Sequence, residues 1–244
     1  MRAVKETVGF IPLDFDPDKL FNYELGMKSE SWDKRVLLNV TLFHMEWEDF
    51  QQSVSGGPWW LRGTINATDK ETDGVEANTQ ILVTDNFTIS GSLLYLDGEF
   101  TEEFTYLDGG VIPAGTESPN QPDWKANIAL DYYLPGALGT EGMFFHYDWA
   151  YQAETWNDLG NAQTNNPNGI IPSWTTSNFR MGVNLQNNWT ISLAIRNMFD
   201  EKAYNWLDTG SNYISDHFGS PIRLNVRSYN RPRNIALQVR KGFY

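Results

Sequence analysis

The chain has 244 residues and a formal net charge of −13, which excludes nucleic acid as a partner because phosphate binding needs a basic surface. It contains no cysteine, so it has no disulfide bond and no thiolate metal site, and no apolar run reaches the roughly 18 residues of a membrane helix. Aromatic residues make up 14% of the chain and include 10 Trp and 11 Tyr, the two types that are enriched at membrane interfaces.

Apolar and polar side chains alternate over nine segments. This pattern predicts β-strands, because successive side chains point to opposite sides of a pleated chain. An irregular start, broken by Pro12 and Pro17, comes first. In chain order, the predicted strands are Phe21–Ser29, Arg35–Phe50, Gly74–Thr84, Phe87–Asp97, 124–132, 143–152, the two arms of 174–200, and Arg233–Tyr244. Within the second segment the alternation blurs over residues 43–47, which predicts a β-bulge.

The hairpin over 174–200 has the clearest pattern. Its odd positions are apolar, from Phe179 to Ile195, while Arg180 and Arg196 lie on the polar face. Residues 186–188 form the turn, where asparagine tolerates the backbone angles required. Each arm has about ten residues, which fits a tilted strand that crosses a bilayer in about 9–11 residues.

The connections between the predicted strands alternate between short and long. Short turns lie near 31–34, 85–86, 135–136 and 186–188, whereas the long loops cover about 51–72, 98–122, 154–173 and 200–228. Bacterial outer-membrane barrels have short periplasmic turns and long extracellular loops, and an even number of strands. The sequence therefore predicts an all-β fold: an antiparallel transmembrane β-barrel segment of about nine long meandering strands, forming an open partial barrel. The absence of a secretory signal at the start also favours a fragment.

Four local patterns resemble the TonB-dependent outer-membrane receptors. They are the strand at 21–28 (FNYELGMK), Gly74-Val75-Glu76, Asn197-Met198-Phe199-Asp200 followed by Ala203-Tyr204, and the aromatic end of the chain. The family ends on an aromatic residue; here Phe243 fits the register and Tyr244 is one residue extra. The resemblance implies that residues 1–244 are the C-terminal part of a 22-stranded plugged barrel, without the plug and the early strands.

The same resemblance implies a location in the outer membrane of a Gram-negative bacterium and energised uptake of a bulky, scarce nutrient such as an iron–siderophore complex. The implied partners are outer-membrane lipid, small-molecule cargo, a TonB-type energy-coupling protein acting through the missing plug region, and the barrel-assembly machinery. Phe243 and Tyr244 would form the C-terminal signal that this machinery reads. No cofactor and no enzymatic activity are implied.

Two sets of residues are candidates for ligand binding. Arg180 and Arg196 on the polar face would steer an anionic cargo. The alternative, which the sequence favours, is ordinary pairing with carboxylates on the same face, such as Asp131 or Asp148. Aromatic side chains in the loops would stack on ligand rings, or else pack within the loops or contact lipid headgroups; they are Trp59, Trp60, Trp156, Trp206 and Tyr213.

Two other functions remain open from the sequence. The adjacent Asp216 and His217 would allow an outer-membrane hydrolase that acts at the rim, although no Ser-His-Asp order, phosphate loop or metal-ligand spacing supports it. A soluble all-β binding protein is the other alternative. In a soluble protein, the apolar ring that includes Trp124, Tyr132, Phe145 and Trp149 would pack into a dry core; in a membrane protein it would face outward.

Overall fold

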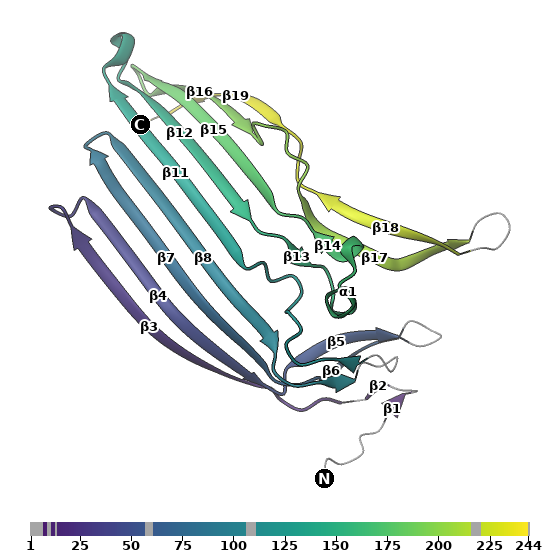
Figure 1. Cartoon of the computed structure of the whole chain (residues 1–244). Helices are drawn as coiled ribbons and strands as arrows, with labels where there is room; N and C mark the ends of the chain where they lie inside the picture. The colour runs from purple at the N-terminus through teal and green to yellow at the C-terminus, as the bar shows by residue number, and fades with distance from the viewer. Residues whose placement is uncertain are drawn as a thin grey trace.

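The computed structural model describes residues 7–8, 11–12, 14–56, 61–105, 111–215 and 221–243. Its main feature is one nine-stranded antiparallel sheet, called here the main sheet (Figure 1). Its strands follow one another in chain order, so each inner strand pairs with the strands that precede and follow it in this sheet. The nine strands of the main sheet are β3 (Lys19–Ser31), β4 (Val36–Glu48), β7 (Lys70–Thr84), β8 (Phe87–Phe100), β11 (Trp124–Pro135), β12 (Gly142–Gln152), β15 (Trp174–Leu185), β16 (Trp189–Arg196) and β19 (Asn234–Lys241).

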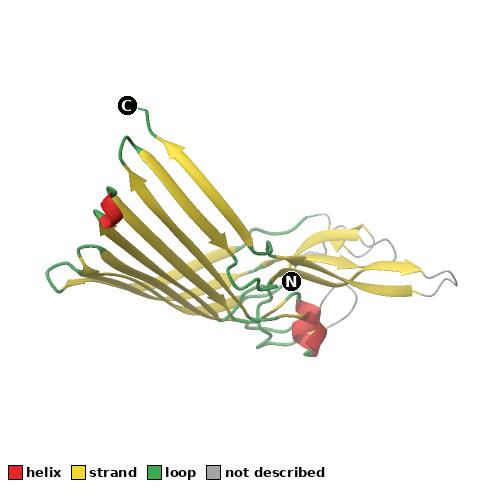
Figure 2. Cartoon of the chain, turned by 90° about the horizontal axis from the view of Figure 1, so that it is seen from above, coloured by secondary structure: helices red, strands yellow, loops and turns green. Residues whose placement is uncertain are grey.

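This meander confirms the predicted fold, including its lack of closure. Strands β3 and β19 are the two edges of the main sheet, and they are not paired with each other. Seen from above, the sheet is curved and open (Figure 2). The turn at Asn187 and Asn188 has φ of 61° at both residues, as expected for a tight hairpin built on asparagine.

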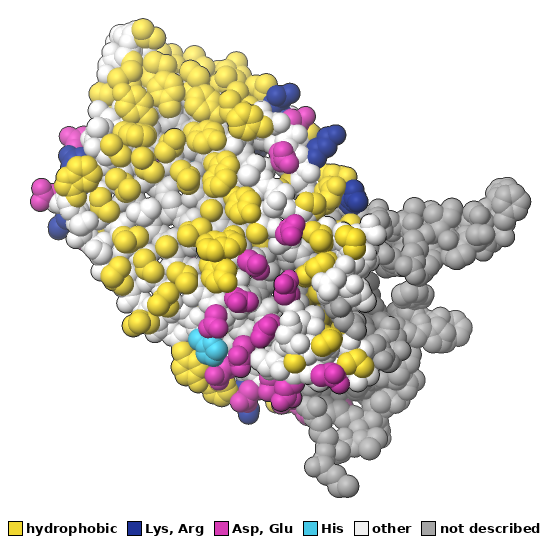
Figure 3. Space-filling model, viewed as in Figure 1, with side chains coloured by type: hydrophobic (Ala, Val, Ile, Leu, Met, Phe, Trp, Pro, Cys, Tyr) yellow, Lys and Arg dark blue, Asp and Glu magenta, His cyan; other side chains and the backbone are white. Residues whose placement is uncertain are grey.

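The main sheet has an apolar face and a polar face. On the apolar face, Leu25, Leu42, Val75, Tyr95 and Trp124 follow one another across five strands in direct register. Many of these side chains are exposed, including Leu25 at 72% and Leu237 at 73% (Figure 3). Trp124 and Tyr132 are also exposed, so this face does not form the dry core that a soluble binding protein would need.

The apolar face changes to acidic toward the long loops. Its last two registers there carry Glu46, Glu71 and Glu99, then His44, Asp73 and Asp97. Figure 3 shows acidic side chains gathered beside the apolar area. Register between β4 and both neighbours is continuous, so the bulge predicted at 43–47 is wrong. The alternation blurs because the outward positions become polar where the strand extends beyond the span that a bilayer covers.

The end of the sheet that carries the long loops, called here the loop end, holds additional small elements (Figure 1). Four strand pairs form separate two-stranded sheets there: β5 (Gln51–Gly56) with β6 (Leu61–Asn66), β9 (Phe104–Thr105) with β10 (Val111–Ile112), β13 (Thr155–Trp156) with β14 (Ile170–Ile171), and β17 (Tyr204–Ser215) with β18 (Pro221–Tyr229). The loop end also holds the pair β1 (Thr7–Val8) and β2 (Ile11–Pro12), the helix α1 (Leu159–Thr164) and the 3-10 turn η2 (Pro167–Gly169). The other 3-10 turn, η1 (Ala137–Gly139), lies in the short connection between β11 and β12 at the opposite end of the sheet.

The buried core lies in these loop elements rather than in the main sheet. Phe100, Phe104, Ile112 and Leu159 are almost fully buried and pack together, with Phe50 against them. They come from three successive long loops or the strand ends beside them, so the loops fold onto one another. Within the described ranges, no helix is long and apolar enough to cross a membrane.

Candidate functional site

The polar face of strands β11 to β19 carries two neighbouring rows of charged and amide side chains. In one row, Asp131, His146 and Arg180 lie in direct register; in the next row toward the loop end, Asp148, Asn178 and Arg196 follow one another. Alternation within each strand places all six on the face opposite the apolar one. The predicted facing of Arg180 and Arg196 is therefore correct.

The two aspartates of these rows bind His146 rather than the arginines. His146 Nδ1 lies 2.7 Å from Asp131 Oδ1, and His146 Nε2 lies 3.4 Å from Asp148 Oδ1. Asp148 also accepts a hydrogen bond from Asn178 Nδ2 at 2.6 Å. The expected pairing of Arg180 or Arg196 with these aspartates is therefore wrong, because His146 lies between the carboxylates and occupies both.

Arg180 and Arg196 keep their charges available. In the described part of the chain, no carboxylate forms an ion pair with either guanidinium group, and Arg180 instead lies over the ring of Phe144 at 5.5 Å. Both arginines line a hollow of about 460 Å³. Its other polar lining includes His146 and Asp148, which lie beside one another, and the amides of Asn178, Asn234 and Gln238. Guanidinium groups that form no ion pair within their own sheet are suited to binding an anionic ligand.

A second hollow, of about 400 Å³, adjoins the first and shares Asn178, Arg196 and Asn234 with it. It adds Arg231 and Arg233 from the connection between β18 and β19. Arg180, Arg196, Arg231 and Arg233 are called the arginine wall below. Residues 180–244 hold nine of the 18 Lys and Arg but only four of the 31 Asp and Glu, and this uneven distribution is the sequence signal that could have found the wall.

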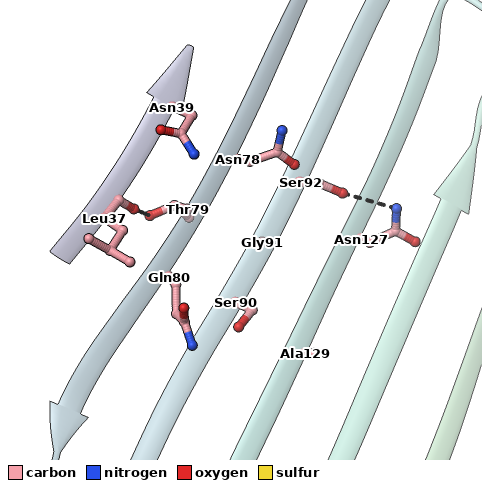
Figure 4. Close-up of a pocket in the computed structure, with 10 residues that line it drawn as sticks. All are labelled: Leu37, Asn39, Asn78, Thr79, Gln80, Ser90, Gly91, Ser92, Asn127 and Ala129. Carbon is pink, nitrogen blue, oxygen red and sulfur yellow. Dashed lines mark hydrogen bonds between the residues drawn. The ribbon is translucent and has the colours of Figure 1, made fainter. Parts of the chain in front are cut away.

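The middle of the first strands carries a different hollow on the polar face, one lined only by uncharged residues. This hollow, of about 460 Å³, crosses β4, β7, β8 and β11 and is lined mainly by amides and hydroxyls (Figure 4). Asn127 Nδ2 donates to Ser92 Oγ at 3.1 Å across it. Polar but uncharged groups suit contact with water or with another polar surface, whereas the arginine wall adds a preference for negative charge.

The loop aromatics do not gather at one place. Trp156 in β13 donates from Nε1 to Glu117 Oε2 at 2.9 Å, which joins two loops. Trp206 in β17 is half exposed, and Tyr213 lies in the same strand with its side chain outside the described part. Trp59 and Trp60 lie outside the described residues.

The remaining sequence candidates are placed as follows. Phe243, just after β19, is exposed with the ammonium group of Lys241 over its ring at 5.7 Å, and Tyr244 lies outside the described residues. Asp216 and His217 lie outside them too. Across the ranges that the structure covers, no group of three or more His, Asp or Glu side chains is arranged to hold a metal ion.

Comparison with known proteins identifies the family. Residues 6–198 match the family model described as "TonB dependent receptor-like, beta-barrel". Among curated proteins, the chain is 22% identical over 205 residues to the "Probable TonB-dependent siderophore receptor PiuA" of Acinetobacter baumannii, covering 82% of this chain and 25% of PiuA. It is also 22% identical over 195 residues to the "Metal-pseudopaline receptor CntO" of Pseudomonas aeruginosa, covering 78% of this chain and 25% of CntO.

Solved structures show the same fold. The ferric yersiniabactin uptake receptor FyuA from Yersinia pestis superposes with a TM-score of 0.74 at 19% identity, over 99% of this chain and 33% of FyuA. The structure of PiuA gives a TM-score of 0.69 at 19% identity, over 96% of this chain and 30% of that protein. The chain spans about a quarter of the length of the curated relatives it matches. It therefore belongs to the TonB-dependent receptor family, whose β-barrels lie in the outer membrane of Gram-negative bacteria.

Proposed function

We propose that residues 1–244 form the C-terminal part of a receptor barrel that takes up an iron–siderophore complex or a similar anionic metal chelate across the outer membrane. The apolar face lies against lipid and the polar face lines the barrel interior. The observation that carries the proposal is the arginine wall, which extends from the loop end into the polar face with no carboxylate partner among the described residues.

The arginine wall would act on cargo mainly through charge. Arg231 and Arg233 stand at the loop end, Arg196 follows, and Arg180 lies one alternate position further down the wall. Successive positive groups raise the local concentration of an anion and lower the cost of removing water from it. The half-exposed Trp206 is a candidate for stacking on the same ligand, and Trp59, Trp60, Trp156 and Tyr213 remain candidates from the sequence alone.

The partners follow from the same proposal. Transport against a gradient needs energy, which a TonB-type protein would supply through a plug region inside the barrel. Phe243 and Tyr244 would be the signal for the barrel-assembly machinery, and outer-membrane lipid would cover the apolar face. We assign the chain no catalytic step, in keeping with the relatives, which are receptors.

Uptake by cells tests the proposal. In the source bacterium, deletion of the gene should lower uptake of a radio-iron chelate from a panel of catecholate, hydroxamate and carboxylate siderophores. An uncoupler should abolish the uptake that the intact gene restores. The double variant Arg180→Gln/Arg196→Gln should lower uptake about tenfold or more at limiting chelate, because two charged contacts are removed.

Lys34→Gln, in the turn between β3 and β4, is the matched control because it removes one positive charge far from the arginine wall. It should leave uptake unchanged. Uptake that is the same with and without the gene for every anionic chelate would contradict the proposal.

A further inference from the structure

A fourth hollow, of about 340 Å³, lies on the polar face at the loop end, near the β3 edge of the main sheet, whereas the arginine wall lies near the β19 edge. It is formed by the ends of β3, β4, β7 and β8, by Lys125 at the start of β11 and by the segment 119–122. We call it the Trp47 hollow. Its size lies in the range of sites for small molecules.

One wall of the hollow is an aromatic ring held in place from two sides. Trp47 Nε1 donates to Asp18 Oδ2 at 2.7 Å, and its ring meets the ring of Phe50 edge-on at 4.8 Å between centroids. Met45 and Leu96 add apolar surface beside it. A fixed aromatic wall with apolar neighbours is suited to stacking with a planar ring.

The charged groups of the lining are both positive. Lys70 and Lys125 line the hollow, and no Asp or Glu does, although the chain carries 31 acidic residues. The ammonium group of Lys70 donates to Gln121 Oε1 at 3.0 Å and lies over the ring of Phe50 at 5.6 Å. Lys125 is exposed and, within the described residues, forms no ion pair. These two groups favour a ligand that carries negative charge.

Gln121 adds a hydrogen-bond donor that is not satisfied in the described structure. Its Nε2 is fully buried and has no partner, although its Oε1 binds Lys70. The side chain packs against Gly98, where any Cβ would collide with that nitrogen, so the absence of a side chain at Gly98 makes room for the amide. Buried polar groups are nearly always paired. This nitrogen is closed off by Gly98, so Gln121 acts on the hollow through Lys70, whose ammonium group its Oε1 holds in place.

The segment above the hollow is held in place by its neighbours. Asn120 donates from its backbone to the Trp156 carbonyl at 2.7 Å and from its side chain to the Asn157 carbonyl at 2.9 Å. Ser118 N donates to Gly98 O at 2.9 Å. The hollow is therefore preformed, which lowers the entropic cost of binding.

We infer that the Trp47 hollow is a second ligand site and that it binds an aromatic acid, meaning a planar ring with ionised carboxylate or phenolate oxygens. The ring stacks on Trp47, and the oxygens contact the ammonium groups of Lys125 and Lys70. The inference rests on the proposed function in one respect: the aromatic acid is a chemical group of the cargo, so the cargo class is narrowed to chelates that carry such rings.

Equilibrium dialysis tests the site directly. The probe is radiolabelled salicylate, and the sample is outer-membrane vesicles that carry the full protein, with vesicles lacking it as the blank. Saturable binding is expected. Cyclohexanecarboxylate, which has the charge without the ring, and benzyl alcohol, which has the ring without the charge, should both compete poorly.

Three variants assign the binding to the hollow. Lys125→Gln should weaken salicylate binding about tenfold, and because Lys125 is exposed this change leaves the fold intact. Trp47→Phe should retain binding through its ring, whereas Trp47→Ala should lose it. Lys28→Gln on β3, nearer the short turns, is the matched control and should bind as the unmodified protein does. No saturable binding, or equal binding by Lys125→Gln and Lys28→Gln, would overturn the inference.

The test is independent of the uptake experiment. Uptake that depends on the gene together with no salicylate binding would reject the Trp47 hollow and leave the proposed function standing. If Lys125→Gln weakens salicylate binding but deletion of the gene changes no uptake, the Trp47 hollow stands as a ligand site and the proposed function is rejected. Binding lost in Arg196→Gln but kept in Lys125→Gln would place the aromatic acid at the arginine wall and contradict the inference.

Discussion

The side-chain amide of Asn197 donates a hydrogen bond to the carbonyl oxygen of Arg231 at 3.0 Å, across 34 positions of sequence. The same side chain donates to Glu201 O and accepts from Glu201 N, each at 2.9 Å. Asp200, three residues on, accepts from the backbone of Arg233 at 2.8 Å. The motif at 197–200 thus closes the base of the β17–β18 hairpin and holds the backbone of the two outer arginines of the arginine wall.

Asn197→Ala should lower the free energy of unfolding by about 2–4 kcal/mol, because a buried side chain loses three hydrogen bonds. Its φ of 49° adds strain for alanine, which asparagine tolerates better. Asn197→Gly removes the same bonds without that strain and should be about 1 kcal/mol less harmful. Urea unfolding in lipid vesicles measures both variants. If both variants had the same free energy of unfolding as the unmodified protein, the hydrogen bonds of Asn197 would not stabilise the base of the β17–β18 hairpin.

Adjacent positions of β19 should respond differently to the same charge. Leu237→Arg places a cation on the apolar face and should destabilise the inserted protein by roughly 2–4 kcal/mol at mid-bilayer depth. Gln238→Arg, one residue along and on the polar face beside the arginine wall, should cost far less. A refolding titration into vesicles gives both values, and equal losses would contradict the assigned faces.

Two glycines on the polar face are covered by an aromatic ring from the neighbouring strand. Phe43 lies over Gly74 and Phe144 over Gly182, so that a Cβ at either glycine would collide with the ring. Gly74→Ala should therefore cost about 1–3 kcal/mol by overpacking. Adding Phe43→Ala should cost less than the sum of the two single changes, because the ring that clashes has gone. Gly26→Ala, which meets only Thr41 Oγ1 at 3.8 Å, is the control and should be neutral or slightly stabilising. Additive losses at Gly74 and Phe43 would argue against the ring–glycine contact.

Asp123, in the loop before β11, makes stability depend on pH. Partial burial, followed by the nearby charges of Glu117, Asp97 and Glu154, raises the pKa of its carboxyl group above the ordinary 3.8. The folded state therefore binds the proton more tightly than the unfolded state, and ionised Asp123 lowers stability at neutral pH. Asp123→Asn should be more stable than the unmodified protein at pH 7. The difference should shrink as the pH falls through the raised pKa and vanish below 3.8, as urea midpoints at both ends of this range would show. A constant difference across the range would contradict the assignment.

The main sheet could be predicted from sequence because one of its faces meets lipid. Alternation of apolar and polar side chains located all nine strands, although β3 begins at Lys19 and ends at Ser31, two residues beyond the prediction at each end. The hairpins β5–β6 and β17–β18 could not be found in this way. Apolar and polar residues alternate along a strand only where one of its faces is buried or lies in lipid. β5 begins with Gln51-Gln52-Ser53, which are all polar, so no alternation reveals the strand.

The candidate site could be predicted only in part, for a similar reason. Arg180 and Arg196 were found because a regular alternation places them on the polar face of the 174–200 hairpin. Arg231 and Arg233 lie in a loop, and Trp47, Lys70 and Gln121 come from three different segments that only the folded register brings together. The pairing of Asp131 and Asp148 with His146 likewise depends on which strands are neighbours, which composition does not encode.

Thiol accessibility along β16 in bacterial outer membranes tests directly whether the apolar face of the main sheet lies against lipid. The chain contains no cysteine, so single substitutions give a clean signal. Thr190→Cys and Ala194→Cys on the polar face should react with a hydrophilic maleimide. Ile191→Cys, Leu193→Cys and Ile195→Cys on the apolar face should be protected by lipid and react only after detergent is added. The predicted result is that reactivity alternates along the strand, with the even-numbered positions reactive and the odd-numbered positions protected. Uniform labelling, or labelling in the opposite phase, would contradict the claim that the apolar face lies against lipid.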